Sequence, residues 1–154
     1  MSTAPASVDP VSGFSHEEMK NFIGNHFEDF VNRHDLGAAD RNFATSFVDH
    51  GDDVPPNLAA GIDGAKQYLA AAFKRFPDIH VTIEDMVAEA DKVVVRNWWT
   101  ATDSQSGQKI EFRGIVIWRI EHGNLEIAAL ILEWLERRLG QPVRRDKKAC
   151  SPTS

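Results

Sequence analysis

Residues 79–139 read IHVTIEDMVAEADKVVVRNWWTATDSQSGQKIEFRGIVIWRIEHGNLEIAALILEWLERRL, and this stretch decides the fold. Apolar and polar residues alternate along it, and turn-forming segments interrupt it at 90–91, 104–107 and 121–124. The pattern predicts four antiparallel strands, at 79–88, 93–102, 109–120 and 125–135. The last run, LEWLERRL, also contains strong helix formers, so a helix over 125–140 is the alternative there; the third turn and the alternation in the preceding strand favour a strand to about residue 133.

Helical patterns precede these strands. Ser15 and Glu18 form an S-x-x-E capping box, and apolar residues recur at helical spacing from Met19 to Val31. A short helix is expected at 35–43, a short strand at 47–50, and a third helix that is capped by Asp63 and ends before Pro77. This order predicts an α+β fold shaped like a cone, in which about three N-terminal helices pack on a curved, mostly antiparallel sheet and enclose a pocket.

Length and charge set further bounds. The 154 residues predict one domain at 14–140, with disordered segments at 1–13 and 141–154. The last segment is basic, whereas the rest of the chain is acidic and the net charge is −6, so we expect no nucleic-acid partner. The sequence has no apolar run long enough for a membrane span and no secretory signal, so a cytoplasmic location is expected. Cys150 has no second cysteine to pair with and is expected to be incidental.

Five blocks of the sequence resemble SnoaL-like polyketide cyclases, which belong to the nuclear-transport-factor-like superfamily together with ketosteroid isomerase. The blocks read NRHDL at 32–36, FVDH at 47–50, GIDG at 61–64 followed by FPD at 76–78, DKVVVR at 91–96, and FRGIVIWRI at 112–120. They stand in the same order over about residues 22–135. The resemblance implies a cone with a pocket, proton-transfer chemistry of the cyclase, isomerase or hydratase type without a cofactor, and a homodimer formed through the outer sheet face.

The resemblance also implies where catalytic side chains should stand, and most of these positions are apolar here. Val116 occupies a position where family enzymes often carry an acid or a histidine, and Ala128 and Leu130 fall on the polar run of the last strand. A shift of two or three residues would bring Glu133 to the pocket in place of Leu130, and the sequence leaves this register open. His50 falls near the position of the proton-shuttling carboxylate of ketosteroid isomerase, so His50 is the candidate base. A solvated histidine at a strand end is the alternative.

Strand parity assigns the remaining side chains to two faces of the sheet, because successive residues of a strand point to opposite sides. If Val116 faces the pocket, the alternation along the paired strands also places Asn97 on the inner face. There Asn97 would hydrogen-bond a developing enolate oxygen. The other predicted pocket-lining residues are His26, Phe27, Phe30, Trp99, Phe112, Val116, Trp118, Leu130 and Leu132. Such a wall suits a small hydrophobic molecule of polyketide-, steroid- or terpenoid-like character.

The outward-facing residues of the same strands form an apolar patch that seldom stays exposed on a soluble monomer. We therefore expect a homodimer whose interface includes Trp98, Ile115, Ile117, Ile127 and Ile131, with Arg113 and Arg119 at its rim.

Two functions remain open at this point. One is an enzyme that uses His50 and Asn97, and the other is a non-catalytic module for ligand binding or dimerisation. The second is favoured by the apolar residues at the family's polar positions. The acidic residues around His50 resemble a metal site by composition alone, without a known ligand spacing, so no metal is expected.

Overall fold

The computed structural model describes residues 13–50 and 57–121 and traces the backbone of 127–138. The elements are, in chain order, α1 (His16–Phe27), the π-helical turn η1 (Glu28–Asn32), α2 (Gly37–Asn42), β1 (Phe43–Asp49), α3 (Gly61–Arg75), β2 (His80–Glu89), β3 (Lys92–Thr102), β4 (Lys109–Ile120) and β5 (Ile127–Arg138). Except for Gly13, the predicted disordered segments at 1–13 and 141–154 lie outside the described residues, as does Cys150.

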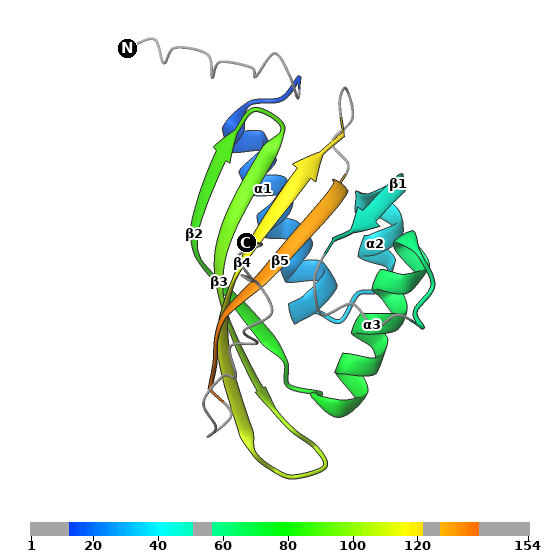
Figure 1. Cartoon of the computed structure of the whole chain (residues 1–154), viewed down its shortest axis with the longest axis vertical. Coiled ribbons are helices and arrows are strands. Elements are labelled where there is room, and N and C mark those ends of the chain that lie inside the picture. The colour runs from blue at the N-terminus through cyan, green and yellow to red at the C-terminus, as the bar shows by residue number, and fades with distance from the viewer. Residues whose placement is uncertain (1–12, 51–56, 122–126, 139–154) are drawn as a thin grey trace, which may run out of the picture.

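One five-stranded sheet, in the order β1-β5-β4-β3-β2, forms the body of the fold. Strands β2 to β5 pair antiparallel, as predicted, whereas β1 pairs with β5 in parallel. In Figure 1, α1 lies behind the strands across one face of the sheet, and α2 and α3 stand beyond its β1 edge. The α+β cone expected from the sequence is therefore confirmed. The predicted end of the last strand is wrong, because β5 continues to Arg138 as a strand and not as a helix.

Helix α1 begins as its sequence predicts. The backbone N–H of Glu18 donates to Ser15 Oγ at 3.1 Å, and the N–H of Ser15 donates to the Glu18 carboxylate at 2.8 Å. The buried side of the helix carries Met19, Ile23 and Phe27 and faces the sheet.

The turn η1 extends α1 toward the edge strand β2. The side-chain amide of its last residue, Asn32, makes both backbone hydrogen bonds of Val81 in β2. Nδ2 donates to the carbonyl of Val81 at 3.0 Å, and Oδ1 accepts from the N–H of Val81 at 2.8 Å. This clamp holds Phe30 and Val31 in the core.

The other two helices differ from the prediction. Helix α2 ends at Asn42, and β1 begins directly at Phe43 and not at residue 47. Helix α3 begins at Gly61 behind the N-cap residue Ala60, so Asp63 lies in the first turn and does not cap the helix. A carboxylate there still interacts favourably with the helix dipole.

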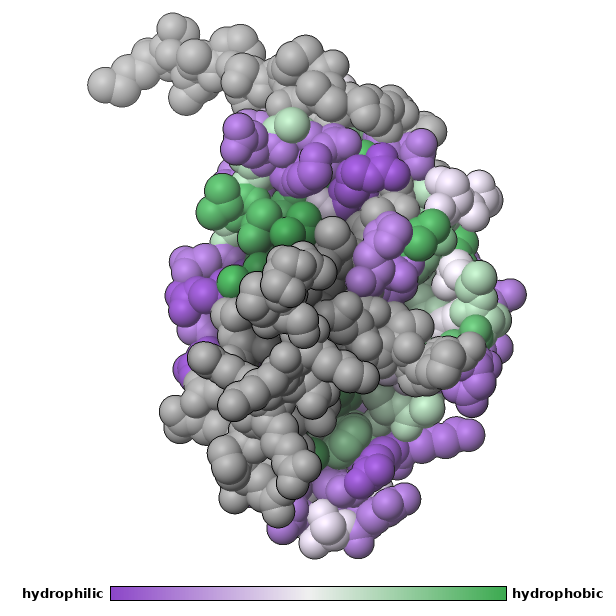
Figure 2. Space-filling model, in the orientation of Figure 1, coloured by the Kyte–Doolittle hydropathy of each residue, from purple (hydrophilic) through white to green (hydrophobic). Residues whose placement is uncertain are grey.

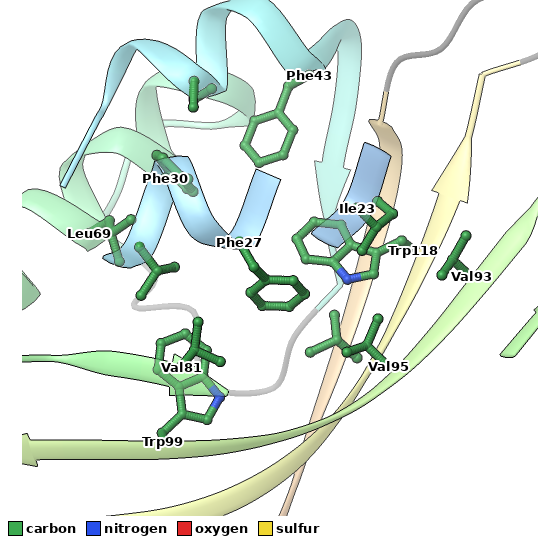
Figure 3. Close-up of a cluster of buried hydrophobic side chains, with 14 of the residues drawn as sticks. Ile23, Phe27, Phe30, Phe43, Leu69, Val81, Val93, Val95, Trp99 and Trp118 are labelled. Atoms are coloured by element: carbon green, nitrogen blue, oxygen red, sulfur yellow. The ribbon is translucent and has the colours of Figure 1, made fainter. Parts of the chain in front are cut away.

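The core fills the space between α1 and the concave face of the sheet, where Figure 3 shows Phe27 between Trp99 and Trp118. Along β3 the buried residues alternate with more exposed ones, so that Val93, Val95, Asn97 and Trp99 are buried. Strand β4 alternates in the same way, with Gly114, Val116, Trp118 and Ile120 buried. This is the parity that the sequence pattern predicts.

The opposite face of the sheet carries the predicted dimer residues. Trp98, Ile115, Ile117, Arg113 and Arg119 are each half-buried there. Figure 2 shows hydrophobic surface at the upper left of this side of the molecule, with hydrophilic side chains above and below it. Arg113 lies over the Trp98 ring, 5.8 Å from its centroid, and pairs with Glu84 at 3.1 Å. The side chains of Ile127 and Ile131 lie outside the described residues. The homodimer stays a prediction.

Candidate ligand-binding site

A cavity of about 250 Å³ lies between the helices and the inner face of the sheet, and its described wall is almost entirely apolar. The sheet contributes its floor, α1 and η1 one side, and β1 and α3 the other. The described lining residues are His26, Phe27, Phe30, Val31, Phe43, Phe47, Val48, Asp49, Leu58, Ala59, Ala60, Gly61, Gly64, Ala65, Tyr68, Leu69, Trp99, Val116 and Trp118.

Aromatic contacts fix the shape of this wall. Phe27 meets Trp118 edge-on with ring centroids 5.4 Å apart, and it meets Trp99 at 6.4 Å. Across the cavity, Phe43 and Phe47 stack at 4.1 Å along β1. Rings held by several neighbours keep one orientation, so the wall is largely preformed and suits a flat apolar ligand.

Helix α3 approaches the segment before it very closely, and this closes one side of the cavity. A Cβ atom built on Gly64 would stand 1.9 Å from the carbonyl oxygen of Ala59. Glycine at this position is what lets residues 59–61 and the first turn of α3 share the lining.

His26 is the most deeply buried polar side chain of the wall, with 1 % of its surface exposed. Its Nδ1 lies 2.9 Å from the side-chain nitrogen of Asn42. Burial, and secondarily the positive charge of Arg41, lowers the pKa of His26 to about 3. The ring is therefore neutral at pH 7. Two nitrogens of the wall, His26 Nε2 and Trp118 Nε1, have no hydrogen-bond partner among the residues that the structure describes.

Asn97 does not line the cavity, although it is fully buried on the inner face of β3 as parity predicts. Its Oδ1 accepts a hydrogen bond of 2.8 Å from Trp99 Nε1, and its Nδ2 has no hydrogen-bond partner within the described part of the chain. In the described structure the Asn97 side chain holds the Trp99 indole and is not presented to a ligand.

His50 does not line the cavity either. It follows the last residue of β1, and both His50 and the preceding residue, Asp49, are exposed. Of the two, only Asp49 is among the described lining residues. The structure thus does not bring His50 and Asn97 together at one site. Phe112 is also outside the lining and stacks on Trp99 at 5.8 Å.

The register of β5 bears on the remaining predicted positions, whose side chains lie outside the described residues. Leu130 stands opposite Trp118, and Leu132 stands opposite Val116. Glu133 stands opposite Ile115, in the alternate set of positions along the strand. Sequence reasoning missed the contributions of β1 and α3 to the wall. The FATSFV run at 43–48 was the available signal, since it carries two phenylalanines four residues apart.

Neither a metal centre nor a membrane span is found in the described part of the chain. No three histidine, cysteine, aspartate or glutamate side chains come together there as metal ligands would. No helix within the described ranges has the length and apolar character needed to cross a membrane.

Comparison with known proteins places this geometry in context. Residues 24–128 match the SnoaL-like domain family. A candidate polyketide cyclase from Bacillus cereus ATCC 10987 is 24% identical, with a TM-score of 0.66 over 76% of this chain and 74% of that chain. A SnoaL-like polyketide cyclase from Agrobacterium tumefaciens C58 is 15% identical, with a TM-score of 0.63 over 75% of this chain and 90% of that chain.

A third similar structure carries a different assignment. AclR, a candidate hydroxylase from Streptomyces galilaeus, is 21% identical, with a TM-score of 0.66 over 78% of this chain and 90% of that chain. No curated protein matches the chain. At these identities the structural likeness establishes the fold and leaves the chemistry to the site itself.

Proposed function

The chain belongs to the SnoaL-like domain family, and on this basis we propose that its cavity binds a small, largely apolar molecule with a polyketide-, steroid- or terpenoid-like ring skeleton. The observation that carries the proposal is the preformed cavity of about 250 Å³ walled by aromatic rings. This volume is close to the lower end of the ~300–1,000 Å³ usual for ligand pockets, so the ligand is compact. The polyketide cyclase names of several structural neighbours support a ring-forming or ring-shaped ligand.

A matched pair of variants on α3 tests this binding. Ala65 lines the cavity, whereas Ala71 lies exposed on the same helix. Ala65→Phe should fill part of the cavity and weaken the binding of tricyclic aromatic compounds by at least about tenfold, because overlap with the added ring forces the ligand or the wall to move. Ala71→Phe should leave binding unchanged.

Binding is measured by isothermal titration calorimetry, and circular dichroism checks that both variants fold. If no tricyclic compound binds the unmodified protein, the proposal is wrong. Equal weakening by both variants would place the binding site elsewhere.

A second candidate function is proton-transfer catalysis on the bound molecule, of the cyclase or isomerase type and without a cofactor. Asp49 favours it, because this residue is the one carboxylate among the described lining residues. His50, the base predicted from the sequence, follows Asp49 and is exposed as Asp49 is, but it is not among the described lining residues. The base role therefore fits Asp49 better than His50.

The two residues are separated by single substitutions once a substrate is known. Asp49→Asn should lower turnover by about 100-fold or more, the usual contribution of a general base. His50→Ala should keep turnover within a few-fold of the unmodified protein. The reverse pattern would assign the base to His50, and full activity in both variants would leave binding as the function.

A further inference from the structure

One part of the cavity wall is buried and another part is exposed. The rings of Phe27, Phe47 and Trp118 are each no more than 4 % exposed. The exposed residues of the described lining come from the end of β1 and from 59–68, and they are Val48, Asp49, Ala59, Ala60 and Tyr68. A Cβ atom built on Gly61 would lie 3.6 Å from the carbonyl oxygen of Phe47, so these two segments are neighbours. We call these five exposed lining residues the mouth of the cavity.

The strand register places Asp49 on the cavity side of the sheet. Asp49 stands opposite Leu130 of β5, and Leu130 stands opposite Trp118 of β4. Residues that stand opposite each other in neighbouring strands lie on the same face of a sheet. Trp118 is a buried lining residue, so Asp49 belongs to the same cross-strand row of the inner face.

Asp49 carries the one formal charge of the described lining at pH 7. An exposed aspartate is ionised at this pH, whereas burial lowers the pKa of His26 to about 3 and keeps that ring neutral. No lysine or arginine is among the described lining residues. Asp49 already has an interaction within the chain, but each of its two carboxylate oxygens can accept more than one hydrogen bond. The described wall is thus apolar where it is buried and negatively charged at its mouth.

We propose that the cavity holds its ligand in one orientation, with the apolar rings among the buried aromatic side chains and a protonated amine at the mouth, where Asp49 binds it. The mouth then selects ligands that carry an amine at this end over ligands that carry a carboxylate. This inference rests on the proposed binding function and adds to it the charge of the ligand.

The selection follows from where the polar end of the ligand can lie. In the reverse orientation this end would be buried among aromatic rings without a partner, which is unfavourable. At the mouth a protonated amine keeps part of its hydration and donates charge-assisted hydrogen bonds to Asp49. A carboxylate at the same place meets a like charge and is repelled.

Three fluorene derivatives that differ only in the substituent on C2 test this selection. At pH 7 the aminomethyl compound is a cation, the hydroxymethyl compound is neutral and the carboxylate is an anion. Their dissociation constants are measured by isothermal titration calorimetry in a buffer of low ionic strength, where charges are least screened. The amine should bind about fivefold tighter than the alcohol, and the alcohol should bind about fivefold tighter than the carboxylate, which is the upper range for a charge pair that water still reaches.

A matched pair of variants assigns the selection to Asp49. Asp49→Asn removes the charge and keeps the shape of the side chain, so it should weaken amine binding about fivefold, tighten carboxylate binding by a similar factor and change alcohol binding by no more than about twofold. Asp63→Asn is the control, because Asp63 is also exposed and lies in the first turn of α3 but outside the described lining. It makes the same change in net charge and should change each constant by no more than about twofold.

Circular dichroism checks that both variants fold. A carboxylate that binds the unmodified protein as tightly as the amine would overturn the selection without the use of any variant. Unchanged constants in Asp49→Asn, or equal changes in both variants, would overturn the role of Asp49. Binding of the alcohol would leave the proposed function standing in each of these cases, whereas the proposed function itself fails if none of the three compounds binds.

Discussion

The buried histidine makes the stability of this protein depend on pH in a way that one substitution should remove. The pKa of His26 is about 3 in the folded chain and about 6.5 in an unfolded one. Between these values the unfolded state takes up a proton that the folded state cannot, so the free energy of unfolding falls as the pH falls. Each pH unit in the window corresponds to ~1.4 kcal/mol. Because the unfolded histidine is already half protonated at pH 6.5, lowering the pH from 6.5 to 4.5 should remove about 2 kcal/mol through His26 alone.

Urea denaturation of the unmodified protein and of His26→Phe, each at pH 7 and pH 4.5, measures this effect. Phenylalanine keeps an aromatic ring among Phe30, Phe43 and Trp118, whose rings lie within 5.5 Å of His26, but it cannot titrate. The unmodified protein should lose at least about 2 kcal/mol more stability than the variant over this interval. Carboxylates that titrate in the same range contribute equally to both proteins and cancel in the difference.

Phe30→Leu is the control for packing alone. It disturbs a ring 5.0 Å from His26 and leaves the histidine in place, so its pH dependence should match that of the unmodified protein. Identical pH dependence in the unmodified protein and in His26→Phe would refute the reasoning, because it would mean that His26 takes up its proton as readily in the folded state as in the unfolded state.

Three further predictions concern the frame of the site. Gly64→Ala should destabilise the chain by about 1–3 kcal/mol in urea denaturation because its Cβ would collide with the carbonyl of Ala59, whereas Gly24→Ala, whose Cβ meets Met86 at an ordinary 3.5 Å, should be neutral or stabilising by up to about 1 kcal/mol. The hydrogen bond and charge of Arg75 lower the pKa of Asp103 to about 2. The stabilisation from this pair is therefore complete above about pH 4 and is lost as the pH falls through 2. Asp103→Asn should make the loss of stability with falling pH smaller in that range, as followed by circular dichroism. Light scattering should find a homodimer that Ile117→Glu converts to monomers, and a monomeric unmodified protein at micromolar concentration would rule that dimer out.

The long antiparallel strands were predictable from the sequence because their signals are local. Alternation along β3 and β4 places Val95, Asn97 and Val116 on one face, and the turns between the strands fix the register from one strand to the next. The capping box of Ser15 and Glu18 is equally local. Each of these features is decided by residues close together in the chain.

The parts that were missed depend on residues far apart in the sequence. Pairing between β1 and β5 joins Phe43 to Ile127, and nothing in either segment alone indicates it. This pairing brings Phe43 and Phe47 into the wall and makes them part of the cavity. Strand parity cannot predict that the Asn97 side chain bonds the Trp99 indole or that His50 is absent from the described lining, because both outcomes depend on the packing around the sheet.

The pairing of the first strand with the last also sets the order in which the protein can be completed during synthesis. Strand β5 is synthesised after helices α1 to α3 and after strands β2, β3 and β4. Strand β1 therefore has no paired neighbour in the sheet until Ile127–Arg138 emerges from the ribosome. Because β1 supplies one side of the cavity, a nascent chain that ends before β5 has an unfinished pocket and an open strand edge, both of which invite association with other chains. The candidate binding site is thus among the last parts of this protein to form, and a chain truncated before β5 should lack the pairing that holds one side of this cavity in place.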